Sequence, residues 1–244
     1  MKSKFLTPFF MILPLSHISN VGQNACAPVK VAVVDTGLDL TDIRLKKHLC
    51  PTGHKNFVDG ESLDDTEGHG THIVGLIEKY ARNSNYCILV YKFYSDSASG
   101  FLDQKREVLS MRQAVRDGAT IVNFSAGGPV FSEEESLVIK QNPQVTFVVA
   151  AGNEGENLDI PGNEFYPASL FYKNMEVVEN VDKRGNRNPS SNYGSKVEYA
   201  ENGTDVVSYL PNGGLGIMTG TSQATAIFSG KLVAKKSKEC HSGE

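Results

Sequence analysis

The stretch VKVAVVDTG, residues 29–37, decides the fold prediction. Residues 29–34 are almost all apolar and Thr36-Gly37 closes the run, a pattern typical of a buried strand followed by a turn. Asp35 stands at the point where this strand should end. Because ligands of open α/β sheets bind beyond the carboxyl ends of the strands, Asp35 is a candidate for binding or chemistry.

Apolar runs and helical patterns alternate along the rest of the chain. Ser132 with Glu135 three positions later fits a capping box, and Gly118 fits the end of a helix. The alternation predicts an α/β fold of three layers, α/β/α, with a mostly parallel central sheet and helices on both faces. The other expected strands are residues 87–93, 119–125, 145–151, 175–181 and 205–210, and the expected helices are residues 72–81, 103–117, 132–140 and 221–236.

Length and composition indicate an ordinary globular protein. The 244 residues suffice for one large domain or two small ones. The chain is 40% hydrophobic and 21% charged, which is usual for such domains. Its net charge of −4 gives no overall basic excess, so we expect no nucleic-acid partner.

The N-terminal segment has the layout of a secretory signal peptide. Two lysines precede a short apolar run at residues 5–15, and small residues follow near residues 25–27. The run is too short for a stable membrane span, and no other stretch is long enough for one. We predict a signal segment at 1–27, a separate folded domain at 28–244 and a secreted or periplasmic location. The alternative is an N-terminal strand or helix packed on the domain.

Four cysteines, Cys26, Cys50, Cys87 and Cys240, could form two disulfides in an exported protein. The sequence leaves three connectivities open. A buried free thiol is the alternative for Cys87, which lies in an apolar run. No pair has the Cys-x-x-Cys spacing of a zinc site.

His69 stands between two glycines in EGHGTH, residues 67–72, directly before a predicted helix. The glycines leave the imidazole room for close approach by other groups. The motif alone fits a catalytic histidine, a structural histidine, or a metal ligand together with His72. It lacks the acidic partner found on a zinc protease helix.

Asn153 and Ser222 lie at two other element ends. Asn153 follows a strand in VVAAGNEG, residues 148–155, where it can satisfy a turn or donate to an oxyanion. Ser222 opens a helix in GIMTGTSQATA, residues 216–226, where it can act as an N-cap or present its backbone N–H to an oxyanion.

Taken together, Asp35, His69 and Ser222 give the order Asp…His…Ser. No second Asp-Thr-Gly or Asp-Ser-Gly occurs, so a two-aspartate mechanism would need another lobe or another copy. The chain resembles the subtilisin-like serine proteases, the subtilases. The matching segments are residues 35–37, 69–72, 125–129, 150–155, 166–168 and 220–222, within roughly residues 29–231.

The resemblance implies a serine endopeptidase that works through an acyl-enzyme. Ser222 would be the nucleophile, His69 the general base and acid, and Asp35 the group that orients the imidazole. Asn153 and the Ser222 N–H would stabilise the oxyanion. The alternatives are a catalytically weak or inactive peptide-binding module on the same fold, or a dedicated processing protease.

The resemblance also implies how the substrate is held. An extended peptide would pair with two segments, and a specificity pocket would lie between residues 125–127 and 151–154. Phe165 should lie near the base of this pocket and Glu154 near its mouth. The pairing segments would be Ser99-Gly100-Phe101 and Ser125-Ala126-Gly127.

The chemistry should need no cofactor, and the expected partners are protein or peptide substrates of a monomeric enzyme. The resemblance allows a structural calcium ion, although no EF-hand pattern occurs. Acidic residues in plausible loops are Asp39, Asp42, Asp59, Asp64 and Asp65.

Overall fold

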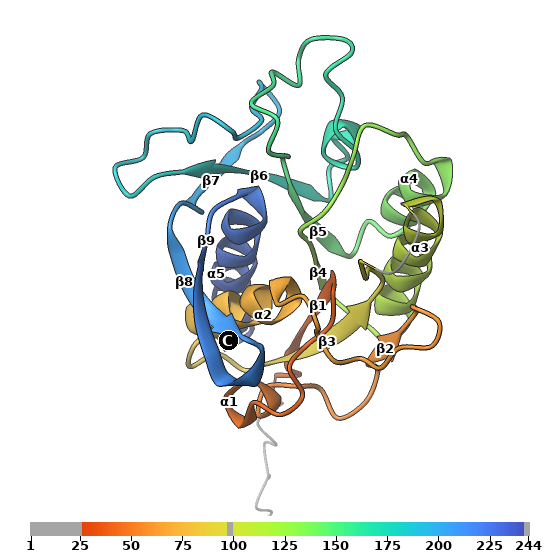
Figure 1. Ribbon diagram of the computed structural model, residues 1–244, viewed down its shortest axis with the longest axis vertical. Coiled ribbons are helices and arrows are strands. Elements are labelled where there is room, and N and C mark those ends of the chain that lie inside the picture. Colours follow the sequence, from red (N-terminus) through yellow and green to blue (C-terminus); the bar gives the residue numbers. More distant parts are fainter. Residues whose placement is uncertain (1–25, 97–99, 242–244) are drawn as a thin grey trace, which may run out of the picture.

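A central sheet of seven strands organises the molecule, as the computed structural model shows for residues 26–96 and 100–241 (Figure 1). The strand order is β2-β3-β1-β4-β5-β6-β7, and every neighbouring pair runs parallel. The predicted parallel sheet is therefore confirmed. The strands are β1 (Val29–Asp35), β2 (Lys55–Asn56), β3 (Tyr86–Lys92), β4 (Ile121–Phe124), β5 (Thr146–Ala150), β6 (Met175–Val181) and β7 (Tyr199–Asn202). Except for residues 26 and 27, the predicted signal segment lies outside the described residues.

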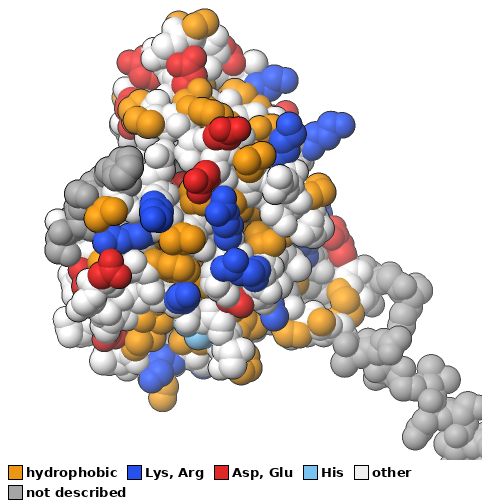
Figure 2. All heavy atoms as spheres, turned by 90° about the vertical axis from the view of Figure 1, so that its right-hand side faces the viewer, with side chains coloured by type: hydrophobic (Ala, Val, Ile, Leu, Met, Phe, Trp, Pro, Cys, Tyr) orange, Lys and Arg blue, Asp and Glu red, His pale blue; other side chains and the backbone are white. Residues whose placement is uncertain are grey.

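Helices cover both faces of the sheet and complete the three predicted layers (Figure 1). Helices α2 (His69–Tyr80) and α5 (Thr221–His241) pack on one face, and α3 (Gly100–Arg116) and α4 (Glu133–Lys140) pack on the other. Figure 2 faces the side that carries α3 and α4, where basic and apolar side chains are intermixed. Among the described residues, no helix combines the length and the apolar character needed to cross a membrane.

The continuous apolar run of β1 is explained by burial from both sides. Val31 and Val33 join the core under α2 and α5, whereas Ala32 and Val34 join the core under α3 and α4. All four side chains are fully buried. Successive side chains of a strand point to opposite faces, so a strand between two helical layers needs apolar residues at every position.

A short antiparallel ribbon lies apart from the central sheet. The strand expected at residues 205–210 is β8 (Val206–Leu210), and it pairs with β9 (Gly214–Met218) rather than with the parallel strands. Strands β2, β7 and β9 and the short helix α1 (Ile43–Lys46) were not predicted. They are short, and β2 and β7 are polar while β9 is interrupted by glycines, so none has a clear hydrophobic period.

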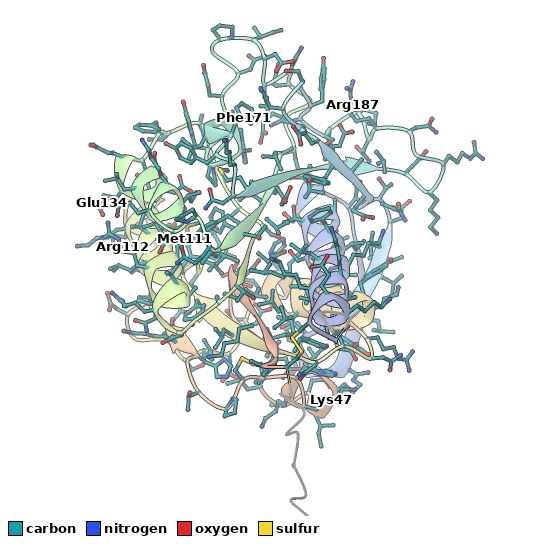
Figure 3. The ribbon with its side chains drawn as sticks, turned by 180° about the vertical axis from the view of Figure 1, so that it is seen from behind. Lys47, Met111, Arg112, Glu134, Phe171 and Arg187 are labelled. Carbon is teal, nitrogen blue, oxygen red and sulfur yellow. A yellow bond between two sulfur atoms is a disulfide. The ribbon has the colours of Figure 1, made fainter. Side chains whose placement is uncertain are left out.

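Two disulfides close the structure, Cys26–Cys240 and Cys50–Cys87 (sulfur in yellow in Figure 3). The first ties the segment before β1 to the last turn of α5, and the second ties the segment after α1 to β3. The expectation of two disulfides is confirmed. The alternative of a free thiol at Cys87 is wrong, since all four cysteines are paired.

Candidate active site

Asp35 and His69 meet at the carboxyl end of the sheet. Asp35 is the last residue of β1 and His69 is the first residue of α2. The imidazole Nδ1 lies 2.7 Å from the Asp35 Oδ1, which also accepts a hydrogen bond from the Thr36 N–H at 2.8 Å. The carboxylate is buried beneath the ring, whereas the His69 side chain is 32% exposed. Asp35 therefore contacts the inward-facing Nδ1 edge of the imidazole, while another part of the His69 ring is exposed to solvent.

The protonation of His69 follows from this contact. Burial lowers the pKa of His69, but the negative charge of Asp35 and its hydrogen bond outweigh that effect and raise the pKa above its ordinary value. Because a carboxylate only accepts, Nδ1 carries the hydrogen of this bond. In the neutral ring the basic nitrogen is then Nε2, on the side away from Asp35.

Glycines let the backbones of β1 and α2 touch. A Cβ on Gly70 would lie 2.3 Å from the Gly37 carbonyl oxygen, and a Cβ on Gly37 would lie 2.4 Å from the Leu63 carbonyl oxygen. Gly37 also has φ +115°, a conformation that side chains disfavour. The sequence analysis expected the two glycines that flank His69, Gly68 and Gly70, to leave room around the imidazole. The structure shows that Gly70 serves the close packing of two backbone segments.

Asp65 fixes the start of α2, a role that the sequence analysis missed. Its buried carboxylate accepts from the N–H groups of Gly68 and Thr71, each at 2.8 Å, and from the Thr36 hydroxyl at 2.9 Å. Burial alone would raise the pKa of Asp65, but these hydrogen bonds favour the charged form and leave the pKa lowered. The sequence pattern that could have predicted this role is an acidic residue just before a helix, where free N–H groups need acceptors.

Ser222 lies in the first turn of α5, beside the end of β4. Its hydroxyl donates to the Ser125 carbonyl oxygen at 2.9 Å, and the Ser125 hydroxyl donates to the Ser222 carbonyl oxygen at 3.1 Å. Ser125 in turn lines the same cavity as Asp35 and His69. Since a hydroxyl has one hydrogen, the Ser222 side chain cannot donate to His69 while it donates to Ser125.

Asn153 follows β5 and is anchored to the start of α5. Its Oδ1 accepts from the Thr221 N–H at 2.9 Å and lies 3.2 Å from the Thr221 hydroxyl. The Gly152 N–H donates to the same hydroxyl at 3.2 Å. Because Oδ1 is bound to Thr221, the Asn153 side chain has a fixed orientation in which its NH₂ group points away from Thr221. A turn role and an oxyanion role are compatible in this arrangement.

The two expected substrate segments differ in conformation. Ser125, Ala126 and Gly127 line a cavity of about 670 Å³ together with Asp35 and His69. In contrast, Gly100 and Phe101 form the first turn of α3, which begins earlier than predicted, and Ser99 lies outside the described residues. A helical backbone is not extended, so residues 100–101 cannot pair as a strand in this conformation.

Phe165 occupies the space between the two walls of the expected specificity pocket. A Cβ on Gly127 would lie 2.5 Å from Phe165 Cε1, and a Cβ on Gly152 would lie 2.9 Å from Phe165 Cγ. The ring therefore lies against both backbone segments. Glu154 is held beside them, because its Oε2 accepts from the Asn192 amide at 2.6 Å.

A sequence model described as "Subtilase family" matches residues 27–240. The chain belongs to the subtilase family. Membership confirms the expected fold class and makes this subtilase a hydrolase of the serine protease type, whose substrates are peptides. The order and spacing of the active-site motifs thus led to the right family.

The relatives named here are bacterial proteases. This subtilase is 30% identical over 226 residues to the major intracellular serine protease of Bacillus subtilis, covering 86% of this chain and 69% of the relative. It is 33% identical to the cell wall-associated protease of the same organism, covering 85% of this chain but only 24% of the relative. Among solved structures, a lanthipeptide protease matches with a TM-score of 0.76 and 25% identity, covering 88% and 74% of the two chains.

The acidic loop residues suggested for calcium already have partners in this subtilase. Asp65 caps α2, Asp39 accepts from the N–H groups of Thr41 and Asn212, and Asp42 caps α1 and pairs with Arg44. Within residues 26–96 and 100–241, no three histidine, cysteine, aspartate or glutamate side chains are grouped to hold a metal ion. A structural calcium ion stays a prediction.

Proposed function

We propose that this subtilase cleaves peptide bonds through an acyl-enzyme formed on Ser222. Ser222 Oγ attacks the scissile carbonyl carbon while His69 Nε2 takes the hydroxyl proton. The tetrahedral intermediate collapses, the C–N bond breaks, and His69 returns the proton to the leaving amine. Water then attacks the ester with the same histidine as base, which releases the acid product and restores Ser222. The 2.7 Å contact between Asp35 and His69 carries this proposal, because it fixes the tautomer with Nε2 as the acceptor.

The oxyanion is stabilised by two donors that meet at the start of α5. The Ser222 N–H belongs to the first turn, where helix N–H groups are free and the dipole favours negative charge. The Asn153 amide supplies the second donor, since its oxygen is already bound by Thr221. Both donors are held before the substrate arrives, so that little reorganisation accompanies charge development.

The acyl side of an extended substrate pairs along residues 125–127, and its last residue faces Phe165. Backbone pairing accepts many sequences, while the pockets select side chains. Because the Phe165 ring lies against Gly127 and Gly152, little depth remains there. A small side chain before the scissile bond is therefore favoured.

The enzyme acts outside the reducing cytoplasm as a monomer. Both disulfides fit an oxidising compartment. The relatives do not decide the location, because one is named intracellular and another cell wall-associated. Sedimentation of the mature protein would test the monomer.

A dedicated processing role is the second candidate. The solved lanthipeptide protease is named for one class of peptide product, and it shares this fold over 88% of the chain. Digestion of a diverse peptide library distinguishes the two candidates. Cleavage of many unrelated sequences supports a general endopeptidase, and cleavage of a narrow set supports a processing enzyme.

Covalent labelling with a fluorophosphonate tests the proposed mechanism. An activated serine should be labelled at Ser222, as peptide mapping by mass spectrometry would show, and Ser222→Ala should remain unlabelled. Labelling with and without a chelator tests the calcium prediction in the same experiment. A folded wild-type protein that resists labelling under both conditions would refute the serine mechanism.

A further inference from the structure

The cavity beside His69 is lined by acidic side chains. It has a volume of about 670 Å³ and extends from the sheet edge to the facing sides of α3 and α4. Among the described residues that line it, none is a lysine or an arginine. Its carboxyl groups are Asp35, Glu67, Asp103, Glu107 and Glu135.

Two of these carboxyl groups face each other across the helices. Glu107 of α3 and Glu135 of α4 line the same cavity, and the two carboxyl groups lie close enough to influence each other's ionisation. Glu135 is only 3% exposed, and its Oε1 has no hydrogen-bond partner. Buried polar atoms are almost always satisfied, so this atom indicates that a donor is missing from the pair.

The environment of the pair favours an added cation. Burial raises the pKa of Glu135, and burial together with the charge of Glu135 raises the pKa of Glu107. Arg106, which precedes Glu107 in the sequence, contacts Asp103 and Asp59 instead. A guanidinium or ammonium group between the two carboxyl groups would compensate their charge and donate to the unsatisfied oxygen.

We propose that Glu107 and Glu135 bind a cationic side chain of the peptide substrate, on the acyl side of the scissile bond. This assignment rests on the proposed function, which places the acyl side of the substrate along residues 125–127. These residues line the same cavity as the pair, and an extended peptide advances about 3.3 Å per residue, so a side chain a few positions from the cleaved bond reaches it. Arginine suits the pair best, because its planar fork can donate to two carboxyl groups at once.

Matched peptides test the proposal. Arginine and its uncharged analogue citrulline would be placed in turn at each position of the acyl side, and kcat/KM measured for each peptide. At one position the wild-type enzyme should prefer arginine by about tenfold or more, as a charge-assisted hydrogen bond in a buried site allows. The double variant Glu107→Gln, Glu135→Gln should bring this ratio close to one.

A neighbouring glutamate supplies the control. Glu134 is adjacent to Glu135 on α4, but its side chain is 67% exposed and contacts Arg112 at 3.4 Å on the outer side of the helices (Figure 3). Glu134→Gln removes the same charge and should keep the wild-type preference for arginine. Thermal unfolding of all variants checks that each is folded.

Equilibrium binding separates this proposal from the proposed function. If Ser222 is not labelled and no peptide is cleaved, the mechanism fails, and fluorescence anisotropy of the same peptides on the wild-type protein still tests the pair. Tighter binding of the arginine peptide by about tenfold, lost in the double variant, supports the cation site. Equal affinity for arginine and citrulline peptides, or a preference that survives in the double variant, overturns it.

Discussion

The hydroxyl of Ser222 and the carbonyl oxygen of Ser125 are hydrogen-bonded at 2.9 Å, which joins the start of α5 to the end of β4. The bond holds the candidate nucleophile over the segment where the substrate is proposed to pair. It also occupies the only hydrogen of the hydroxyl, so the proposed attack would require the side chain to turn from Ser125 to His69.

Replacing the nucleophile should abolish hydrolysis without unfolding the protein. Ser222→Ala removes the attacking oxygen, and casein hydrolysis should fall at least about 10³-fold, to the level that binding and the oxyanion site alone can support. Ser195→Ala, at an exposed serine, is the matched control and should retain full activity. Undiminished turnover by a folded Ser222→Ala variant would exclude the acyl-enzyme.

Asn153→Ala should reduce kcat more than it changes KM. The amide acts on the charge that develops in the tetrahedral intermediate, and removal of such a donor costs about 3–4 kcal/mol, or roughly 10²–10³-fold in kcat. Steady-state kinetics on one peptide give both constants. A rise in KM at constant kcat would assign Asn153 to substrate binding instead.

The pH dependence of kcat/KM should report the Asp35–His69 pair. His69 must be neutral to act as the base, so activity should fall as the pH drops through its pKa. The negative charge of Asp35 raises this pKa above the ordinary value of 6.5. Asp35→Asn removes the negative charge, so the acid limb of the residual activity should move to lower pH, with kcat reduced about 10⁴-fold. An acid limb at the same pH in both proteins would show that Asp35 does not act on His69.

Asp65→Ala should destabilise the start of α2. The substitution leaves three backbone N–H groups and the Thr36 hydroxyl without their acceptor, at a cost of about 2–3 kcal/mol in the free energy of unfolding. Because the pKa of Asp65 is lowered in the folded state, its contribution is present at neutral pH and is lost as the pH falls through that pKa. Urea unfolding at neutral and at acid pH should therefore show a difference from wild type that shrinks in acid.

Removal of the Cys50–Cys87 disulfide should lower stability more than activity. The bond closes a segment with a sequence separation of 37 residues, and its loss should cost about 2–4 kcal/mol in the free energy of unfolding. Chemical denaturation of Cys50→Ala, Cys87→Ala against wild type measures the difference. Equal stability of the two proteins under oxidising conditions would show that the bond contributes nothing to the folded state.

The sequence predicted the interior of the fold better than its edges. Strands β1, β3, β4 and β5 are rich in apolar residues, because helices bury both of their faces. Edge strands β2 and β7 are short and largely polar, since solvent replaces one neighbour, and no periodic pattern distinguishes them from loops.

The site was predictable where chemistry demands particular residues in a particular order. Asp35 and His69 were found in this way, and the structure brings them into contact. Asp65 was noted only as an acidic loop residue, although its position just before a helix indicated a capping role. The facing of Glu107 and Glu135 depends on how α3 packs against α4, which spacing within each helix cannot reveal.

The most direct test of the account is a crystal structure of the enzyme with a phosphonate bound covalently to Ser222. We expect His69 Nε2 within about 3 Å of Ser222 Oγ, as general-base geometry requires, with Asp35 still bound to Nδ1. The phosphonyl oxygen should lie about 2.7–3.1 Å from both the Asn153 amide and the Ser222 N–H. An imidazole well beyond hydrogen-bonding distance from Oγ, or a phosphonyl oxygen turned away from both donors, would contradict the proposed site.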